Sequence, residues 1–257
     1  MDPSEASFRF YAELNDFFPT PSRQEGRRAV DIPYGFHVSP TVKDAIEALG
    51  VPHVEVDLIL VNGTSVGFDH RLEDGDRVSV YPVFESLDIS PIVRLREAPL
   101  RESAFVADVH LRRLARLLRL LGFDVLHSND LDDAQLVEIS AGEGRILLSR
   151  DRQLLKHGRV THGYWVRSTD PIEQAREVVR RFDLARSACP FSRCPACNGR
   201  LEPVEKEAVA DEIPPKTARW LDEYVQCAEC GKLYWRGTHF ERLEGLMERI
   251  LGDPSQA

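Results

Sequence analysis

Apolar and polar residues alternate in several short runs near the start of the chain, which is the pattern of half-buried β-strands. Between the second and third runs, apolar residues at helical spacing predict a helix that begins near Pro40 and ends at Gly50. The dipeptide Asn62-Gly63 predicts a tight hairpin turn. The expected strands cover residues 7–14, 27–36, 56–61 and 77–83. Residues 1–88 are therefore predicted to form a small mixed α/β domain.

The pattern changes after a polar, proline-containing stretch at residues 89–102. Short buried runs now alternate with helical runs, as in the strand Ala104 to Ala107 and the leucine-rich helix that stops at Gly122. Strands are expected at residues 104–107, 123–126, 145–149 and 160–166, and helices at 111–121, 132–141 and 171–182. Because helices separate these strands, residues 103–188 are expected to form a domain with a parallel sheet.

The formal net charge of the 257-residue chain is −9, which at first argues against a nucleic-acid partner. Residues 1–90 account for this excess, because they hold 7 basic and 16 acidic side chains. Residues 91–188 hold 17 basic and 14 acidic side chains, and so carry a net charge of +3. One predicted helix contains Arg112, Arg113, Arg116 and Arg119. This helix presents either an ordinary solvated face or a surface for a polyanion.

The start of the chain shows no basic stretch followed by an apolar run, so no secretory signal is expected. No window approaches the roughly 18 uninterrupted apolar residues that span a bilayer. The chain is therefore expected to be cytoplasmic and to have no membrane partner. Its five cysteines fit that compartment, because an odd number argues against a disulfide framework.

Four of the cysteines form two Cys-x-x-C pairs that are separated by 29 residues. Each pair lets two thiolates reach one ion around a tight turn, and four sulfurs suit tetrahedral Zn²⁺. A redox Cys-x-x-C motif would explain one pair but not two. The predicted ligands are Cys194, Cys197, Cys227 and Cys230. Because protein fills all four positions, the zinc is expected to be structural, within a ribbon at residues 189–252. Cys189 is expected to be a small apolar core residue.

Three carboxylates in the middle segment follow predicted strands or begin the next helix: Asp108, Asp133 and Asp151. The carboxyl ends of parallel strands line the ligand crevice of an open sheet, so these acids are expected to converge there. Converging carboxylates repel one another unless a hard cation neutralises them, which predicts Mg²⁺ or Mn²⁺. Such a site suits the hydrolysis of a phosphodiester.

Each acid also has a structural alternative. Asp133 can cap its helix, although Asp132 beside it is an equally good cap. Asp151 can interact with the dipole of the helix that follows it. Asp108 has no obvious capping geometry to require it, which favours the metal site.

The order strand, strand, helix, strand, strand in residues 1–88 is that of a ubiquitin-like β-grasp domain. The run VNGTSVGFDHRLEDGDRVSVYPVF resembles the sulphur-carrier (ThiS/MoaD-like) branch of that superfamily. Carriers end in a diglycine tail, whereas this chain continues through residues 85–88 without one. The domain is therefore expected to be a structural or docking module, open to a protein partner and dispensable for chemistry.

The chain resembles the Mut-seven C-terminal RNase domain family in four stretches: FVADVHLRRLARLLRLLGFDV, DDAQLVEISAGEGRILLSRDRQLL, RCPACNGRL and CAECGKLYWRGTHFERL. That family combines a PIN-like nuclease domain with a fused zinc ribbon, and the resemblance covers about residues 103–250. The N-terminal segment resembles the ubiquitin-like domain fused in front of the family. Ser149 stands where the family usually has a threonine before Arg-Asp.

The resemblance implies that the PIN-type acids are Asp108, Asp133 and Asp151. Many PIN nucleases have a fourth acid, for which Asp132 and Asp170 are candidates. Contacts to the RNA backbone are expected from Arg112, Arg150, Arg152 and Lys156. The leading interpretation is a Mg²⁺- or Mn²⁺-dependent ribonuclease with an α/β fold: a ubiquitin-like β-grasp domain, a PIN-like parallel sheet with helices, and a zinc ribbon. The alternative is a non-catalytic RNA- or protein-binding adaptor that retains this fold.

Overall fold

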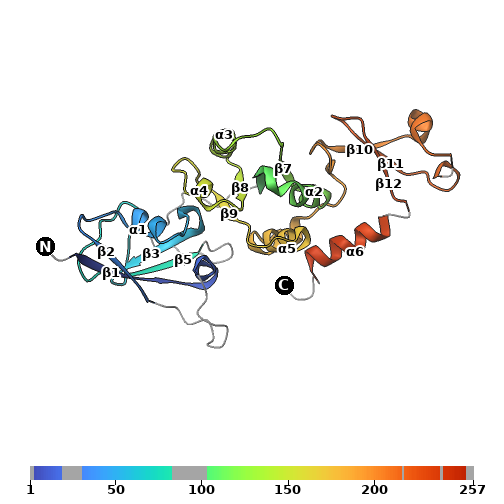
Figure 1. Ribbon diagram of the computed structural model, residues 1–257. Coiled ribbons are helices and arrows are strands. Elements are labelled where there is room, and N and C mark those ends of the chain that lie inside the picture. Colours follow the sequence, from blue (N-terminus) through green and yellow to red (C-terminus); the bar gives the residue numbers. More distant parts are fainter. Residues whose placement is uncertain (1–2, 19–30, 83–102, 216, 238–239, 253–257) are drawn as a thin grey trace. The chain divides into compact units, whose positions relative to one another are not determined.

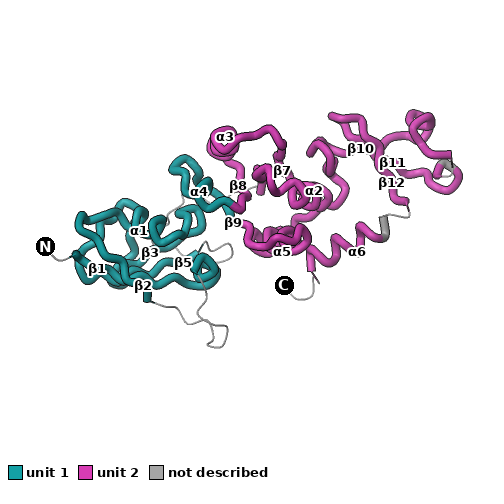
Figure 2. Tube along the Cα trace, in the orientation of Figure 1, with its two compact units in different colours: residues 1–101, 151–165 teal, residues 102–150, 166–257 magenta. Residues whose placement is uncertain are grey.

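A computed structural model describes residues 3–18, 31–82, 103–215, 217–237 and 240–252 (Figure 1). The chain separates into two compact units, coloured teal and magenta in Figure 2. Unit 1 comprises Met1–Arg101 and Asp151–Trp165, and unit 2 comprises Glu102–Arg150 and Val166–Ala257. No helix in the described ranges is both long and apolar enough to cross a membrane.

The N-terminal part of unit 1 is a β-sheet packed against a helix. Its elements are β1 (Ser4–Phe10), η1 (Ala12–Phe17), β2 (Asp31–Phe36), α1 (Val42–Ala48), η2 (His53–Glu55), β3 (Val56–Val61), β4 (Thr64–Ser65) and β5 (Arg77–Pro82). The strand order is β2-β1-β5-β3-β4, in which β1 and β5 are parallel and the other neighbours are antiparallel. This is the β-grasp arrangement, as the sequence predicts.

Helix α1 begins at a capping box. The Thr41 hydroxyl accepts a hydrogen bond from the backbone N–H of Asp44 at 3.1 Å, and the Asp44 carboxylate accepts one from the backbone N–H of Thr41 at 3.3 Å. The apolar face of the helix is fully buried against aromatic residues of the sheet. These core residues include Val42, Ala45, Ile46, Phe8 and Phe10. Burial of this face fixes the helix on the sheet.

The first strand begins and ends earlier than the predicted range of residues 7–14. β1 ends at Phe10, and Ala12 has a positive φ of 49°, which turns the chain into the 3₁₀ helix η1. Leu14 and Phe17 are both buried from this helix. The prediction that the strand continues to Leu14 is therefore wrong. The alternation of apolar and polar residues continues to Leu14, but the backbone already turns at Ala12.

The parallel sheet of unit 2 has β6 between β7 and β8. The elements are β6 (Ala104–Ala107), η3 (Val109–Leu111), α2 (Arg112–Leu120), β7 (Asp124–Leu126), α3 (Asp133–Glu143), β8 (Ile146–Ser149), α5 (Pro171–Arg181) and η4 (Ala185–Ser187). β6 and β8 are almost fully buried, since helices pack beside them, whereas the edge strand β7 is half-buried. This confirms the predicted parallel sheet.

The C-terminal part of unit 2 contains an antiparallel sheet in the order β10-β11-β12. Its elements are β10 (Leu201–Val204), η5 (Lys206–Glu212), η6 (Thr217–Arg219), β11 (Tyr224–Cys227), β12 (Leu233–Trp235) and α6 (Phe240–Leu251). Val209, Ile213 and Tyr224 form its small apolar core. Because this core is small, the sheet needs a further source of stability.

Residues 151–165 belong to unit 1 although they follow the third strand of the parallel sheet in the sequence (Figure 2). They contain the short helix α4 (Arg152–Leu155) and the strand β9 (Gly163–Trp165). We refer to residues 151–165 as the docking segment. The predicted strand at 160–166 is present as the shorter β9.

Candidate functional site

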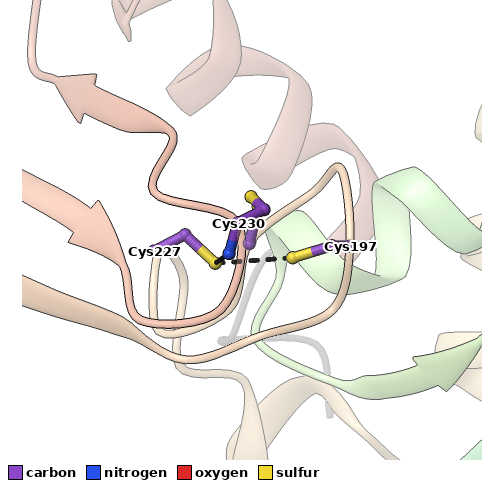
Figure 3. A group of neighbouring side chains, drawn as sticks. Cys197, Cys227 and Cys230 are labelled. Carbon is purple, nitrogen blue, oxygen red and sulfur yellow. Dashed lines mark hydrogen bonds between the residues drawn. The ribbon is translucent and has the colours of Figure 1, made fainter.

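The four cysteines of the two Cys-x-x-C pairs lie together, with all four sulfur atoms within 4.8 Å of one another. The sulfurs of Cys194 and Cys230 are 3.7 Å apart, and those of Cys197 and Cys227 are 3.4 Å apart. In Figure 3 the sulfur of Cys227 faces the sulfur of Cys197 and the backbone nitrogen of Cys230. Zn–S bonds of about 2.3 Å in a tetrahedron require sulfur–sulfur distances of about 3.8 Å. The cluster therefore suggests a zinc site.

The surroundings of the cluster do not act equally on its thiols, because the pKa of Cys194 is lowered whereas the pKa values of Cys197 and Cys230 are raised. The backbone N–H groups of Gly199 and Cys230 lie 3.4 Å and 3.5 Å from the sulfurs of Cys197 and Cys227. Burial by itself raises the pKa of Cys194, but the Tyr234 hydroxyl and nearby backbone N–H groups lower it to about 7. Since zinc binds the deprotonated thiol, the contacts of Cys194 suit a metal ligand, and the raised pKa values of Cys197 and Cys230 mean that zinc binding would have to displace their protons.

We call residues 194–199, which contain the first Cys-x-x-C pair, the first knuckle. Asn198 in this knuckle attaches the cluster to the edge strand β7. Its side-chain oxygen accepts a hydrogen bond from the backbone N–H of Val125 at 3.0 Å, and its side-chain nitrogen donates to the carboxylate of Asp124 at 2.8 Å. Asn198 thus pairs the backbone N–H of Val125 on this edge strand. Arg145 and Arg193 also donate to Asp124, at 2.7 Å and 3.2 Å. Burial raises the pKa of Asp124, but these donors hold it below its usual value.

Arg119 lies between the parallel sheet and the first knuckle, and only 5% of its surface is exposed. Its Nε donates to the carbonyl oxygen of Val125 at 2.8 Å, and its Nη1 donates to that of Ala196 at 3.1 Å. Burial lowers the pKa of Arg119, while negative charge at Cys197 and Cys194 opposes this effect. The idea that Arg119 belongs to a polyanion surface is therefore wrong, because its guanidinium group is buried against backbone carbonyls.

Gly122, at the end of α2, allows the chain that enters the ribbon to approach closely. It has a φ of +96°, and a Cβ atom there would lie 2.1 Å from the carbonyl oxygen of Cys189. The backbone N–H of Cys189 donates to the carbonyl oxygen of Leu121 at 3.0 Å. The Cys189 residue is exposed, so its prediction as a core residue is wrong. Its backbone, and not its side chain, makes the structural contact.

At the carboxyl ends of the parallel strands, Asp108 and Ser149 connect β6 to β8. The Ser149 hydroxyl donates to one carboxylate oxygen of Asp108 at 2.7 Å, and both residues are buried. The other carboxylate oxygen accepts a hydrogen bond from the backbone N–H of His110 at 2.8 Å. Asp108 therefore caps η3, and the expectation that it had no capping geometry is wrong. The cap exists because a 3₁₀ turn precedes helix α2.

His127 lies at the same edge of the sheet, directly after β7, and the sequence pattern did not identify it. Its Nε2 is 3.2 Å from the carbonyl oxygen of Val109, so this nitrogen carries a proton. Burial lowers the pKa of His127, and the positive charges of Arg119 and Arg112 lower it further. The neutral imidazole is therefore favoured here. Its position after a strand was the available signal in the sequence.

Asp132 and Asp133 have different roles at the start of α3. The Asp132 carboxylate accepts a hydrogen bond from the backbone N–H of Gln135 at 2.8 Å, and the Gln135 side chain accepts one from the backbone N–H of Asp132 at 2.9 Å. Asp133 is the first residue inside the helix and is exposed. Asp132 thus supplies the cap, and the Asp133 carboxylate is not needed for it.

Asp151 belongs to unit 1, whereas Asp108 and Asp133 belong to unit 2. The Asp151 carboxylate accepts a hydrogen bond from the backbone N–H of Gln153 at 2.7 Å and caps the short helix α4. Asp151 therefore has the helix-capping role that was the structural alternative to metal binding. It also lies two residues after Ser149, which ends β8.

The four cations expected to contact RNA fall into two pairs. Arg112 and Arg150 are exposed, at the start of α2 and directly after β8. Arg152 and Lys156 are partly buried, and each donates a hydrogen bond to a backbone carbonyl oxygen within unit 1.

Two family models match the chain. Residues 103–247 match the model of the Mut7-C RNAse domain, and residues 3–88 match that of the Mut7-C ubiquitin domain. A human protein named exonuclease mut-7 homolog is 34% identical over 108 residues, which are 40% of this chain and 12% of that relative's length. No solved structure matches the chain. The chain therefore belongs to the Mut7-C RNase domain family and carries the ubiquitin-like domain of that family in front of it.

Proposed function

We propose that this protein is a metal-dependent ribonuclease that hydrolyses phosphodiester bonds of RNA. Membership of the RNase domain family supports a nucleic-acid substrate and nuclease chemistry. The observation that carries the proposal further is the environment of Asp108. This carboxylate is only 6% exposed and lies at the carboxyl end of β6, where ligands of parallel sheets bind.

Among the described residues, no cationic side chain forms an ion pair that would balance the charge of the Asp108 carboxylate. In the described part of the chain its hydrogen-bond donors are a serine hydroxyl and a backbone N–H, and no Arg, Lys or His side chain forms an ion pair with it. A buried carboxylate without a counter-charge is unfavourable. Carboxylate oxygens are the ligands that Mg²⁺ and Mn²⁺ prefer, so the donor set fits such an ion.

Asp133 and Asp151 would complete the ligand set with Asp108. Asp133 suits this role because Asp132 supplies the helix cap and leaves the Asp133 carboxylate available for another use. Asp151 follows Ser149, the partner of Asp108, by two residues. When bound, the divalent ion supplies electrostatic stabilisation for the charge that develops on the phosphodiester. The Ser149 hydroxyl would hold the Asp108 carboxylate in a fixed orientation.

Arg112 and Arg150 are the exposed cations proposed to hold the RNA backbone. Contacts of guanidinium groups with phosphates carry no sequence information, so binding should depend on salt more than on base sequence. The sequence predicts the same RNA-binding role for Arg152 and Lys156, but the charged group of each donates a hydrogen bond to a backbone carbonyl oxygen.

The test is cleavage of labelled single-stranded RNA with Mn²⁺, with Mg²⁺ and with a chelator. The Asp108→Asn, Asp133→Asn and Asp151→Asn variants should each lose activity by orders of magnitude, and double variants should be little worse than single ones. Asp211→Asn, in an exposed part of the ribbon, is the charge-matched control. Three variants that cleave like the wild type would refute the proposed site.

A non-catalytic adaptor that binds RNA or protein is the second candidate. One observation favours it: Asp108 and Asp151 both cap helices, so each acid has a structural role without a metal. In addition, the four cysteines are the only group of three or more His, Cys, Asp or Glu side chains among the described residues that lie close enough together to share a metal ion. The adaptor predicts RNA retention in a filter assay with no divalent-dependent cleavage by the wild-type chain. The ubiquitin-like domain would then be the natural place for a protein partner.

A further inference from the structure

The docking segment, residues 151–165, has extensive contacts with the ubiquitin-like fold inside unit 1. More than 100 positions separate the contacting residues in several of these pairs. The segment also contains Asp151, one of the three proposed metal ligands. What holds the segment therefore bears directly on the proposed site.

The first contact is made by Arg152, next to Asp151. Its guanidinium carbon lies 3.9 Å from the ring centre of Trp165 and 5.0 Å from that of Phe17. Its Nη1 donates a hydrogen bond to the carbonyl oxygen of Phe17 at 3.2 Å. The two aromatic rings are 4.7 Å apart, centre to centre. The guanidinium group therefore lies over both rings, which also contact each other, and the ring faces attract its positive charge.

The second contact joins the segment to helix α1 and the turn that follows it. The Lys156 ammonium group donates to the carbonyl oxygen of Glu47 at 2.6 Å. His53 is 8% exposed, and its Nε2 lies 3.0 Å from the carbonyl oxygen of Val160. Because Glu47 lies in the last turn of α1, Lys156 also places a positive charge at the negative end of that helix.

The third contact is made by the fully buried side chain of Glu55. Its carboxylate accepts a hydrogen bond from the backbone N–H of Trp165 at 2.6 Å. A hydrogen bond from an N–H group to a buried carboxylate is stronger than one between neutral groups. Within unit 1, the ubiquitin-like fold thus contacts the segment near its beginning through Arg152 and at its end through Trp165.

We infer that the ubiquitin-like fold is a positioning element of the nuclease, which holds the docking segment and thereby orients Asp151. In this inference Phe17 and Glu55 are positioning residues, and Arg152 and Lys156 serve the docking and not the binding of phosphates. The role assigned to Asp151 rests on the proposed function, but the docking itself does not. This replaces the expectation that the chemistry can dispense with the ubiquitin-like domain.

Hydrogen exchange of backbone amides in the full-length protein tests the docking directly. Arg152→Gln removes the cation that lies over the two rings, and Phe17→Leu removes one ring but keeps an apolar core side chain. Each variant should increase exchange in residues 151–165 on the order of tenfold, while residues 104–126 exchange as in the wild type. Arg112→Gln, an exposed arginine outside the segment, is the control and should leave exchange in the segment unchanged. Unchanged exchange in both test variants would overturn the inference.

RNA binding as a function of salt separates positioning from phosphate contact. If Arg152 positions Asp151, the Arg152→Gln variant should need several-fold more Mn²⁺ for half-maximal cleavage, with the wild-type salt dependence of RNA binding. If Arg152 instead contacts a phosphate, the slope of log K against log salt should fall by about 0.7 to 0.9, and exchange should not change. That result would also overturn the inference. Faster exchange together with a wild-type chain that never cleaves RNA would preserve the docking and refute the proposed function.

Discussion

The Ser149 hydroxyl donates a hydrogen bond of 2.7 Å to the Asp108 carboxylate, although 41 positions separate the two residues. The bond crosses from the end of β8 to the end of β6, which are neighbouring parallel strands. Both side chains are buried, so water does not compete strongly for either partner. The bond therefore fixes the orientation of the carboxylate at the edge where the metal site is proposed.

Replacing Ser149 with alanine should affect metal affinity more than stability. The variant loses the hydrogen bond to Asp108, at a cost of about 1–2 kcal/mol of unfolding free energy. The freed carboxylate should also bind Mn²⁺ about 10–100-fold more weakly, as for other residues that orient metal ligands. Mn²⁺ titration of RNA cleavage and urea unfolding measure the two effects.

Ser140→Ala is a matched control for this experiment. Ser140 is equally buried and donates to the carbonyl oxygen of Arg145 at 2.8 Å, but it does not contact Asp108. Its loss should give a similar decrease in stability with an unchanged Mn²⁺ requirement. Equal Mn²⁺ requirements in both variants would argue against an orienting role for Ser149.

The sequence predicted strands correctly where an apolar run is bounded by recognisable turn or cap residues. β3 and β6 occur at the predicted residues, because each is an apolar run bounded by clear turn or cap residues. The four cysteines were identified because ligand spacing is a local property. The assignment of residues 151–165 to unit 1 was not predictable in this way. It depends on contacts such as that of Arg152 with Phe17, across 135 positions, which no local pattern encodes.

Zinc removal should unfold the C-terminal part of unit 2. One zinc per chain is expected, and Cys194→Ser and Cys227→Ser should each lower this stoichiometry and reduce the melting temperature, since metal binding and folding are coupled in small domains. Elemental analysis and thermal unfolding with a chelator provide the measurements. Cys189→Ser is the control, because this exposed cysteine lies outside the cluster and should retain full zinc. Protein purified without any zinc would contradict the assignment.

Arg119→Met should loosen the attachment of the first knuckle to the sheet. The substitution keeps an apolar stem but removes the hydrogen bonds to Val125 and Ala196, which should cost about 2–4 kcal/mol of unfolding free energy. Zinc should also be released faster to a chelator. Arg116→Met, on the exposed side of the same helix, should change stability by less than about 0.5 kcal/mol. Equal stabilities of the two variants would show that burial of Arg119 contributes nothing.

His127 should make the fold less stable in mild acid. Since burial lowers its pKa in the folded state, its stabilising contribution is fully present above the ordinary pKa of 6.5 and is lost as the pH falls through the lower folded value. The His127→Gln variant keeps an N–H donor for Val109 but cannot titrate. Urea unfolding between pH 7.5 and pH 5.5, values that are about one unit either side of the ordinary histidine pKa, should show a smaller loss of stability for this variant. A difference between the two proteins that is constant across this range would contradict the prediction.

The discontinuity of unit 1 has a consequence for the order of events during synthesis. When the ribosome has released the first hundred residues, the β-grasp sheet can already form, but the surface that later receives Arg152, Lys156 and Trp165 still lacks its occupant. The first three strands of the parallel sheet must emerge before that surface is filled. A domain that appears N-terminal and separate in the sequence is thus finished late, by a segment that arrives with the nuclease sheet.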